Sequence, residues 1–157
     1  MKGSEVRVAA LREEDLPAAL PLFAGYQHFY EAQPDDGANM RFFRRFVDPS
    51  EDGLLLGAWV GDDLVGFACL YWTFSSTHAA EIALMNDLFV ADGHRGEGIG
   101  RALIDAAVEA ARVRGMHSLE WLTGIDNRRA QRLYDRTEAA RAAWYGYEIG
   151  PLQSRPA

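Results

Sequence analysis

Four glycines lie in one short segment of the chain, between a strand-like run and a helix-like run. The segment reads Asp92-Gly93-His94-Arg95-Gly96-Glu97-Gly98-Ile99-Gly100-Arg101. Glycines let the backbone curl so that successive N–H groups converge, and the N-terminus of the following helix adds partial positive charge. Arg95 and Arg101 can add charge-assisted hydrogen bonds to phosphate oxygens. The segment therefore predicts a phosphate-binding turn.

The alternative is a tight turn without a ligand, but four glycines around one arginine exceed what a turn needs. Two common phosphate motifs fit poorly. A Walker A loop needs Gly-Lys followed by Ser or Thr, and Lys2 is the only lysine of the chain. A dinucleotide fingerprint needs Gly-x-Gly-x-x-Gly, whereas the sequence has Gly96-x-Gly98-x-Gly100. The turn is thus predicted to bind a phosphorylated ligand of another kind.

Two runs of the sequence resemble signatures of the GNAT superfamily of N-acetyltransferases. Residues 95–100, Arg-Gly-Glu-Gly-Ile-Gly, resemble the family's Arg/Gln-x-x-Gly-x-Gly/Ala motif, and Asn127-x-x-Ala130-x-x-Leu133-Tyr134 resembles its next motif. Residues 86–90, Asn-Asp-Leu-Phe-Val, are most similar to the diamine and polyamine acetyltransferases, although Asn86 stands where these often carry Glu. The resemblance covers nearly the whole chain and implies acetyl-CoA as the co-substrate.

The resemblance also implies which residues hold acetyl-CoA. The loop amides would bind the pyrophosphate, Asn127 the pantetheine arm, and the strand backbone at 88–90 the pantetheine amides. The implied acetyl-CoA-binding residues are Leu88, Phe89, Val90, Arg95, Gly96, Glu97, Gly98, Ile99, Gly100, Arg101, Asn127 and Tyr134.

Acetyl transfer to an amine needs a neutral amine, donors for the developing oxyanion and a proton for the departing thiolate. Tyr134 matches the family's general acid; the alternative is a core aromatic in the stripe formed by 130, 133, 134 and 137. Asp87 is the candidate catalytic base, or else Glu81, acting through water. A carboxylate at a strand rim that is only solvated is the open alternative.

The resemblance implies that the first helix and two neighbouring strands flank the acceptor pocket, so aromatic side chains of these elements are expected to line it, with core packing as the alternative. The candidate substrate-binding residues are Tyr26, Tyr30, Trp72, Phe74 and Glu81, with Phe29 and Trp144 as weaker members. An acidic group, Glu31, Asp35 and Asp36, either attracts a cation or forms a solvated loop.

Hydrophobic periodicity predicts one α/β domain over residues 1–157, with a mixed central sheet and the element order β-α-α-β-β-β-α-β-α-β. The resemblance implies that this domain has a GNAT-like fold. Strands are expected at 6–10, 54–60, 64–74, 81–90, 118–123 and 142–149, and helices at 13–31, around 40–47, at 99–114 and at 127–137. The third helix is expected to bury Ile99, Leu103, Ala106, Ala110 and Val113, and to end at a left-handed Gly115. Residues 150–157 are expected to be a frayed tail.

Composition excludes several classes of protein. Sixteen basic against 23 acidic residues give a net charge of −7, so no nucleic-acid or lipid surface is expected. Residues 1–63 carry 12 acidic and 6 basic side chains, and the remaining residues carry 11 and 10, which suits either a cationic substrate or an ordinary acidic protein.

No apolar stretch reaches the roughly 18 residues of a membrane span, and no signal peptide is expected. The histidines are scattered and Cys69 is expected in the core, so the chain is predicted to be cytoplasmic and metal-free.

These features predict transfer of an acetyl group from acetyl-CoA to a primary amine of a small molecule by direct attack. Two alternatives stay open: a coenzyme-A-binding regulatory or assembly module with little catalysis, and an acetyltransferase that modifies a protein amine. The aromatic last strand is a candidate contact for a homodimer.

Overall fold

The computed structural model describes residues 5–153. Its strands are β1 (Val6–Ala10), β2 (Gly53–Val60), β3 (Asp63–Ser75), β4 (Ala80–Val90) and β5 (Leu119–Glu120). Its α-helices are α1 (Leu16–Phe29), α2 (Asp36–Phe43), α3 (Ile99–Val113) and α4 (Arg128–Tyr134). Short 3₁₀ turns cover Glu13–Asp15, Arg44–Phe46 and Asp92–His94. Among the described residues no helix is long and apolar enough to cross a membrane.

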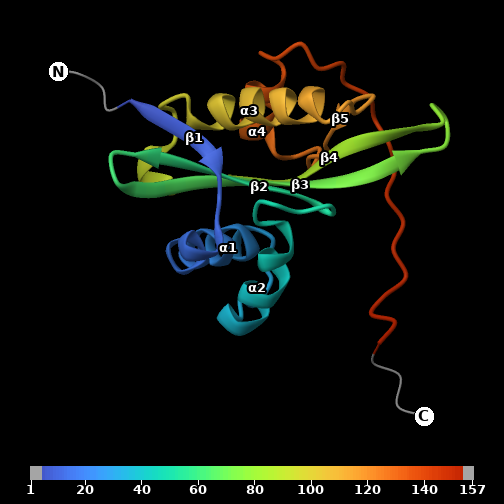
Figure 1. Cartoon of the computed structure of the whole chain (residues 1–157). Helices are drawn as coiled ribbons and strands as arrows, with labels where there is room; N and C mark the ends of the chain where they lie inside the picture. Colours follow the sequence, from blue (N-terminus) through green and yellow to red (C-terminus); the bar gives the residue numbers. More distant parts are fainter. Residues whose placement is uncertain (1–4, 154–157) are drawn as a thin grey trace. The chain divides into compact units, whose positions relative to one another are not determined.

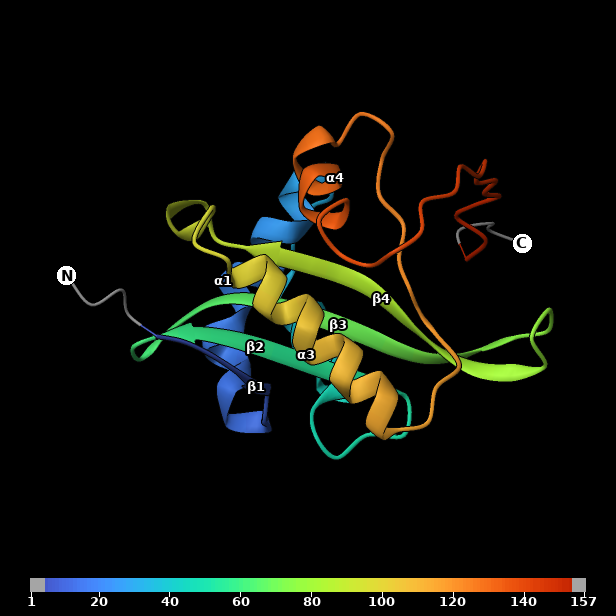
Figure 2. The same ribbon diagram turned by 90° about the horizontal axis from the view of Figure 1, so that it is seen from above.

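The chain divides into two compact units, Met1–Leu122 and Thr123–Ala157. The first holds a five-stranded sheet in the order β1-β2-β3-β4-β5. Neighbouring strands are antiparallel up to β4, and β5 runs parallel to β4. Within this unit α1 and α2 cover one face of the sheet and α3 covers the other (Figures 1 and 2). The predicted α/β class with a mixed sheet is confirmed.

An aromatic core joins the sheet to α1 and α2. Phe23 of α1 stacks on Phe43 of α2 with ring centroids 3.7 Å apart, and the edge of Phe67 from β3 meets Phe23 at 5.0 Å. Gly25 lets α1 approach β4, because a Cβ there would lie 2.7 Å from Cζ of Phe89. The apolar period of residues 16–30 therefore places the end of α1 directly against β4.

The opposite face of the sheet is buried by α3. Its buried residues are Ile99, Leu103, Ile104, Ala107 and Ala111. Gly66 of β3 allows this contact, since a Cβ there would lie 3.4 Å from both Ile99 and Leu103 side chains and 2.9 Å from the Phe89 carbonyl oxygen. The prediction that Val113 is buried is wrong: its side chain is 79% exposed.

The second unit contains α4 and no strand within the described residues. Asn127 caps α4, accepting a hydrogen bond on Oδ1 from the Ala130 N–H at 3.2 Å. The predicted strand 142–149 is wrong, because this segment makes no ladder in the structure. Its apolar side chains are exposed; they are Trp144, Tyr145, Tyr147 and Ile149. Residues 150–153 also carry no regular structure, and 154–157 lie outside the described residues.

Candidate functional site

The glycine-rich loop has the backbone conformation that its sequence predicts. Gly96 and Gly98 have φ values of +85° and +81°, which side chains rarely tolerate. Gly98 is the N-cap residue of α3, and Ile99 anchors the helix start because it is buried under the sheet. A Cβ at Gly93, Gly96 or Gly98 would meet nothing within 4 Å in the described chain, so the loop presents bare backbone.

A run of backbone donors lies at this loop. Within residues 5–153, the N–H groups of the five residues 96–100 donate to no protein acceptor, and the first helical bond runs from Ala102 to the Gly98 carbonyl at 3.0 Å. Unpaired donors at a helix N-terminus, together with the helix dipole, favour an anion. The loop therefore has the donor set that a diphosphate needs.

Arg95 holds the loop in shape. Its Nε donates to the Val90 carbonyl oxygen at 2.9 Å, and its guanidinium pairs with Asp92 at 2.7 Å. It also lies 5.6 Å from the centre of the Phe89 ring. Arg101, in the first turn of α3, pairs with Asp105 at 2.8 Å and is exposed. The backbone N–H groups are thus the main hydrogen-bond donors of the loop, and Arg95 stabilises the loop conformation.

A β-bulge in β4 lies just before the loop. Cys69 of β3 pairs with Asp87, and the next residue Leu70 pairs with Met85, so Asn86 is left without a partner in β3. An extra residue of this kind redirects its neighbours' side chains. Asn86 is exposed while Asp87 turns into the face covered by α1.

The edge of β4 that faces β5 is free beyond the bulge. Parallel pairing with β5 involves only Ala83 and Leu84. From Met85 to Val90, no strand of the described chain pairs along that edge. An extended ligand can add to such an edge as another strand does. This free stretch includes residues 88–90, the three strand residues predicted to bind the co-substrate, and it leads directly into the loop.

Asp87 is the most unusual acid of the site. Its side chain is 3% exposed, and Oδ1 accepts a hydrogen bond from Asn86 Nδ2 at 2.8 Å. Burial raises the pKa of Asp87, while hydrogen bonds from Tyr26 and Asn86 lower it in part. For Asp87, the alternative of a rim carboxylate that is merely solvated is therefore wrong, whereas for the exposed Glu81 it stays open.

Three phenols and one thiol surround this carboxylate. Burial, and then the charge of Asp87, raise the pKa of Tyr26, Tyr30 and Tyr71, so all three phenols are neutral donors near neutral pH. The Tyr26 hydroxyl also lies 3.3 Å from the Asn86 carbonyl oxygen, and its ring lies 5.0 Å from that of Tyr30. Burial raises the pKa of the Cys69 thiol in the same way, and its predicted core position is confirmed.

The structure brings together only part of the predicted acceptor set. Tyr26 and Tyr30 meet at Asp87, but Trp72 lies on the other face of the sheet, where Arg114 of the α3 C-terminus sits 5.0 Å from its ring. Phe74 is 76% exposed and pairs with Glu81 at the far end of the β3–β4 hairpin. Phe29 stacks edge-on against Tyr30 at the exposed end of α1. Tyr134, Asn127 and Trp144 belong to the second unit.

Sequence reasoning missed Tyr71 and the role of Asn86 in the bulge. Tyr71 stands two residues after Cys69 on β3, so the alternation of a strand places both on the face of Asp87. The alternation of β3 was the signal that could have identified Tyr71.

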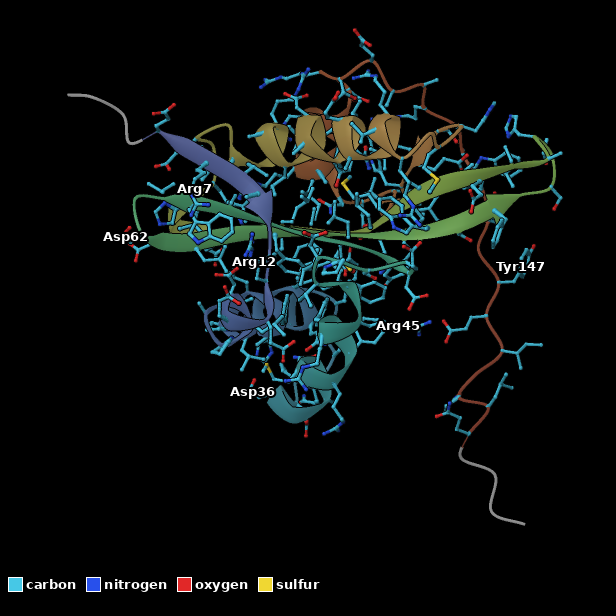
Figure 3. The ribbon with its side chains drawn as sticks, in the orientation of Figure 1. Arg7, Arg12, Asp36, Arg45, Asp62 and Tyr147 are labelled. Atoms are coloured by element: carbon cyan, nitrogen blue, oxygen red, sulfur yellow. The ribbon has the colours of Figure 1, made fainter. Side chains whose placement is uncertain are left out.

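The three acids near α2, Glu31, Asp35 and Asp36, are exposed. Asp35 caps α2 by accepting a hydrogen bond from the Ala38 N–H at 2.6 Å, and Asp36 points away from the sheet (Figure 3).

Residues 12–138 match the family model described as the acetyltransferase (GNAT) family. The chain belongs to this family. It is an acyl-CoA-dependent N-acetyltransferase, as its named relatives are N-acetyltransferases and the matched span includes both signature motifs.

Two curated relatives are similar to this GNAT protein over most of their length. A D-amino-acid N-acetyltransferase of Saccharomyces cerevisiae is 33% identical over 87% of this chain and 86% of its own. An uncharacterized N-acetyltransferase of Bacillus subtilis is 32% identical over 83% of this chain and 87% of its own. Among solved structures, a ribosomal-protein-alanine N-acetyltransferase from Brucella melitensis superposes with a TM-score of 0.76 at 28% identity, covering 93% of this chain and 99% of that one.

GNAT acetyltransferases use acetyl-CoA, and the first unit of this chain fits that co-substrate. The unpaired amides of residues 96–100 suit the pyrophosphate, and the free edge of β4 suits an extended arm with amide groups. Among the described residues no group of three or more His, Cys, Asp or Glu could hold a metal ion.

Proposed function

We propose that this protein transfers an acetyl group from acetyl-CoA to a primary amine of a small molecule. The observation that carries the proposal is the run of five unpaired amides in continuation of the free β4 edge, beside a buried carboxylate. Backbone N–H groups along that edge would polarise the thioester carbonyl, since donors fixed in place stabilise a developing oxyanion.

Direct attack gives a balanced reaction. The neutral amine forms a bond to the thioester carbon, the carbon–sulfur bond breaks, and coenzyme A leaves as a thiolate that Tyr134 protonates. The nitrogen loses a second proton to solvent as it becomes the amide, and solvent returns a proton to Tyr134. Asp87, directly or through water, takes the proton that the ammonium loses. A carboxyl group whose pKa is raised by burial is a better match for this task than an exposed one. Glu81 is exposed at the end of the hairpin and is a weaker base candidate.

Tyr134 would supply the proton to the departing thiolate. It is the last residue of α4, which starts at the Asn127 cap, so the second motif of the family lies on one helix. Because Tyr134 and Asn127 belong to the second unit, the support for their roles is the motif and the continuous family match over residues 12–138.

The relatives favour two kinds of acceptor. The yeast relative is named for D-amino acids and supports a small amine, in line with the resemblance of residues 86–90 to diamine and polyamine enzymes. The solved Brucella structure is named for a ribosomal-protein alanine and supports a protein N-terminus as the second candidate. A coenzyme-A-binding module without catalysis would not need Asp87 in its buried position. The expected cytoplasmic location and homodimer belong to the same proposal.

The test is release of coenzyme A thiol from acetyl-CoA in the presence of a panel of primary amines and of peptides with a free N-terminus. We expect turnover with at least one small amine, at a rate well above that with the peptides. Turnover with peptides alone would transfer the proposal to a protein acceptor. Tight coenzyme A binding with no turnover would favour a binding module.

The general acid is tested by Tyr134→Phe, which keeps the ring and removes the hydroxyl. We expect kcat to fall at least tenfold, because a thiolate must then leave without its proton donor, while coenzyme A affinity changes little. Tyr147→Phe in the exposed segment of the same unit is the matched control and should behave as wild type. Unchanged kcat for Tyr134→Phe would overturn the assigned role.

A further inference from the structure

Asp87 is a buried acid that has no cationic partner among the described residues of the first unit. The ion pairs between described residues involve other acidic side chains. Asp87 instead interacts with Asn86, Cys69 and three tyrosines: Tyr26, Tyr30 and Tyr71. Buried charges in proteins are ordinarily paired or bound to an ion. The hydrogen bond from Asn86 Nδ2 satisfies one lone pair of the carboxylate, and neither Asn86 nor the Tyr26 hydroxyl beside it brings positive charge.

The cluster reaches solvent at the end of α1. Tyr30, the C-cap residue of that helix, is 55% exposed, and its ring contacts the half-buried ring of Tyr26 at 5.0 Å. On the inner side, Tyr71 stacks on Phe46 at 5.1 Å and closes the cluster against the core. Aromatic rings beside a carboxylate form the setting in which proteins bind alkylammonium groups. Tyr26 and Tyr30 thus connect the buried Asp87 to the solvent-exposed end of α1.

We propose that Asp87, Tyr26 and Tyr30 bind the ammonium form of the acceptor, and that this acceptor is an amine with no carboxylate beside its nitrogen. The inference rests on the proposed function, because it names the substrate class of the same site. The bound ammonium supplies the missing charge, and the same contact places its proton on the path to Asp87.

The charge of Asp87 disfavours an acceptor that carries a carboxylate beside its nitrogen. An α-amino acid brings its own carboxylate within two bonds of the nitrogen, and this group would be repelled by Asp87. Among the described residues of the first unit, no arginine, lysine or histidine is a partner of Asp87 that would offset that repulsion. Arg95, which reaches Phe89 on the same strand, is engaged by Asp92 and the Val90 carbonyl. The acceptor would therefore differ from the D-amino acids for which the yeast relative is named.

The experiment is calorimetric titration of amines into the protein saturated with coenzyme A, where no chemistry can occur. The probes are two pairs that differ by one carboxylate: phenethylamine with D-phenylalanine, and cadaverine with D-lysine. We expect each decarboxylated amine to bind at least tenfold more tightly than its amino acid. Equal or tighter binding of the amino acids would overturn the proposal.

Two variants and one control identify the site. Asp87→Asn should weaken phenethylamine binding at least tenfold and Tyr26→Phe about threefold or more, both with coenzyme A affinity within twofold of wild type. Asp63→Asn removes an exposed acid at the start of β3 and should change neither affinity. Should Asp87→Asn not fold, Tyr26→Phe decides alone. Amine binding unaffected by the folded variants would overturn the proposal, whereas normal amine binding without acetyl transfer would overturn the proposed function only.

Discussion

At the scale of single residues, the position of Asp87 depends on its neighbour. The sequence motif led to Asp87, but it did not reveal that Asn86 forms a bulge, or that Tyr71 and Cys69 share the face of the sheet with Asp87. A bulge depends on the pairing of two strands, which are distant in sequence. The identity of a candidate residue was therefore predictable, while its burial and its pKa shift required the fold.

Burial of Asp87 gives a signed prediction for stability. Because the folded protein raises the pKa of Asp87 above its ordinary 3.8, folding favours the protonated form. That contribution is fully present below the unfolded pKa and is lost as pH rises through the folded pKa. Asp87→Asn should therefore stabilise the free protein at pH 7 by on the order of 1 kcal/mol, or about 2–4 °C in Tm, with hydrogen bonds offsetting much of the burial cost.

Thermal unfolding of the wild type and Asp87→Asn from pH 4 to pH 8 checks this. The advantage of the variant should shrink toward pH 4, where the wild-type carboxyl group becomes protonated. Asp63→Asn, which changes an exposed acid, should show no such trend. A Tm difference for Asp87→Asn that is independent of pH would contradict the assignment of the raised pKa to Asp87.

At the scale of elements, turns and helix ends could be predicted from residues that are close in sequence. The β2–β3 hairpin, the strand before the glycine loop and the left-handed Gly115 at the end of α3 were all predicted from nearby residues, and the structure confirms them. The first part of the buried face of α3, Ile99 and Leu103, is confirmed. In its later part Ala107 and Ala111 are buried, one residue beyond the expected Ala106 and Ala110, and Val113 is exposed. Alanines on both faces of α3 leave the hydrophobic period ambiguous, and the sheet decides which face is covered.

Both ends of α3 carry glycines with positive φ, and this allows a matched test of the loop. Gly98→Pro removes an unpaired N–H and cannot adopt the φ of +81°, so we expect coenzyme A binding to be lost. Proline at position 115 cannot adopt the φ of +77° there, and it also removes the hydrogen bond from the Gly115 N–H to the Arg112 carbonyl oxygen. We therefore expect Gly115→Pro to lower the free energy of unfolding at least as much as Gly98→Pro does. Coenzyme A affinity should nevertheless stay near wild type in Gly115→Pro, as measured by calorimetric titration. Normal affinity in Gly98→Pro would refute the pyrophosphate role of the loop.

At the scale of the whole molecule, the net charge of −7 and the anionic co-substrate are compatible, because the donors of the loop are backbone amides. The more specific feature is Asp87 itself, a buried acid with no cationic partner among the described residues of the first unit. The last segment was the main error of the sequence-based fold. Residues 142–149 have the aromatic and aliphatic composition of a strand, but a strand needs a partner edge, and composition cannot say whether one is available.

Hydrogen exchange tests the state of that segment in the complete protein. Amides of residues 142–149 make no ladder in the structure, so at low protein concentration we expect them to exchange at nearly the rate of an unfolded peptide. Amides in the interior of β3, paired on both sides by β2 and β4, should be protected and serve as the internal reference. Protection of 142–149 at every concentration would contradict the structure of this segment. Protection that appears only as concentration rises would instead show that a second copy supplies the edge, which the exposed Trp144, at 82%, is well suited to cover.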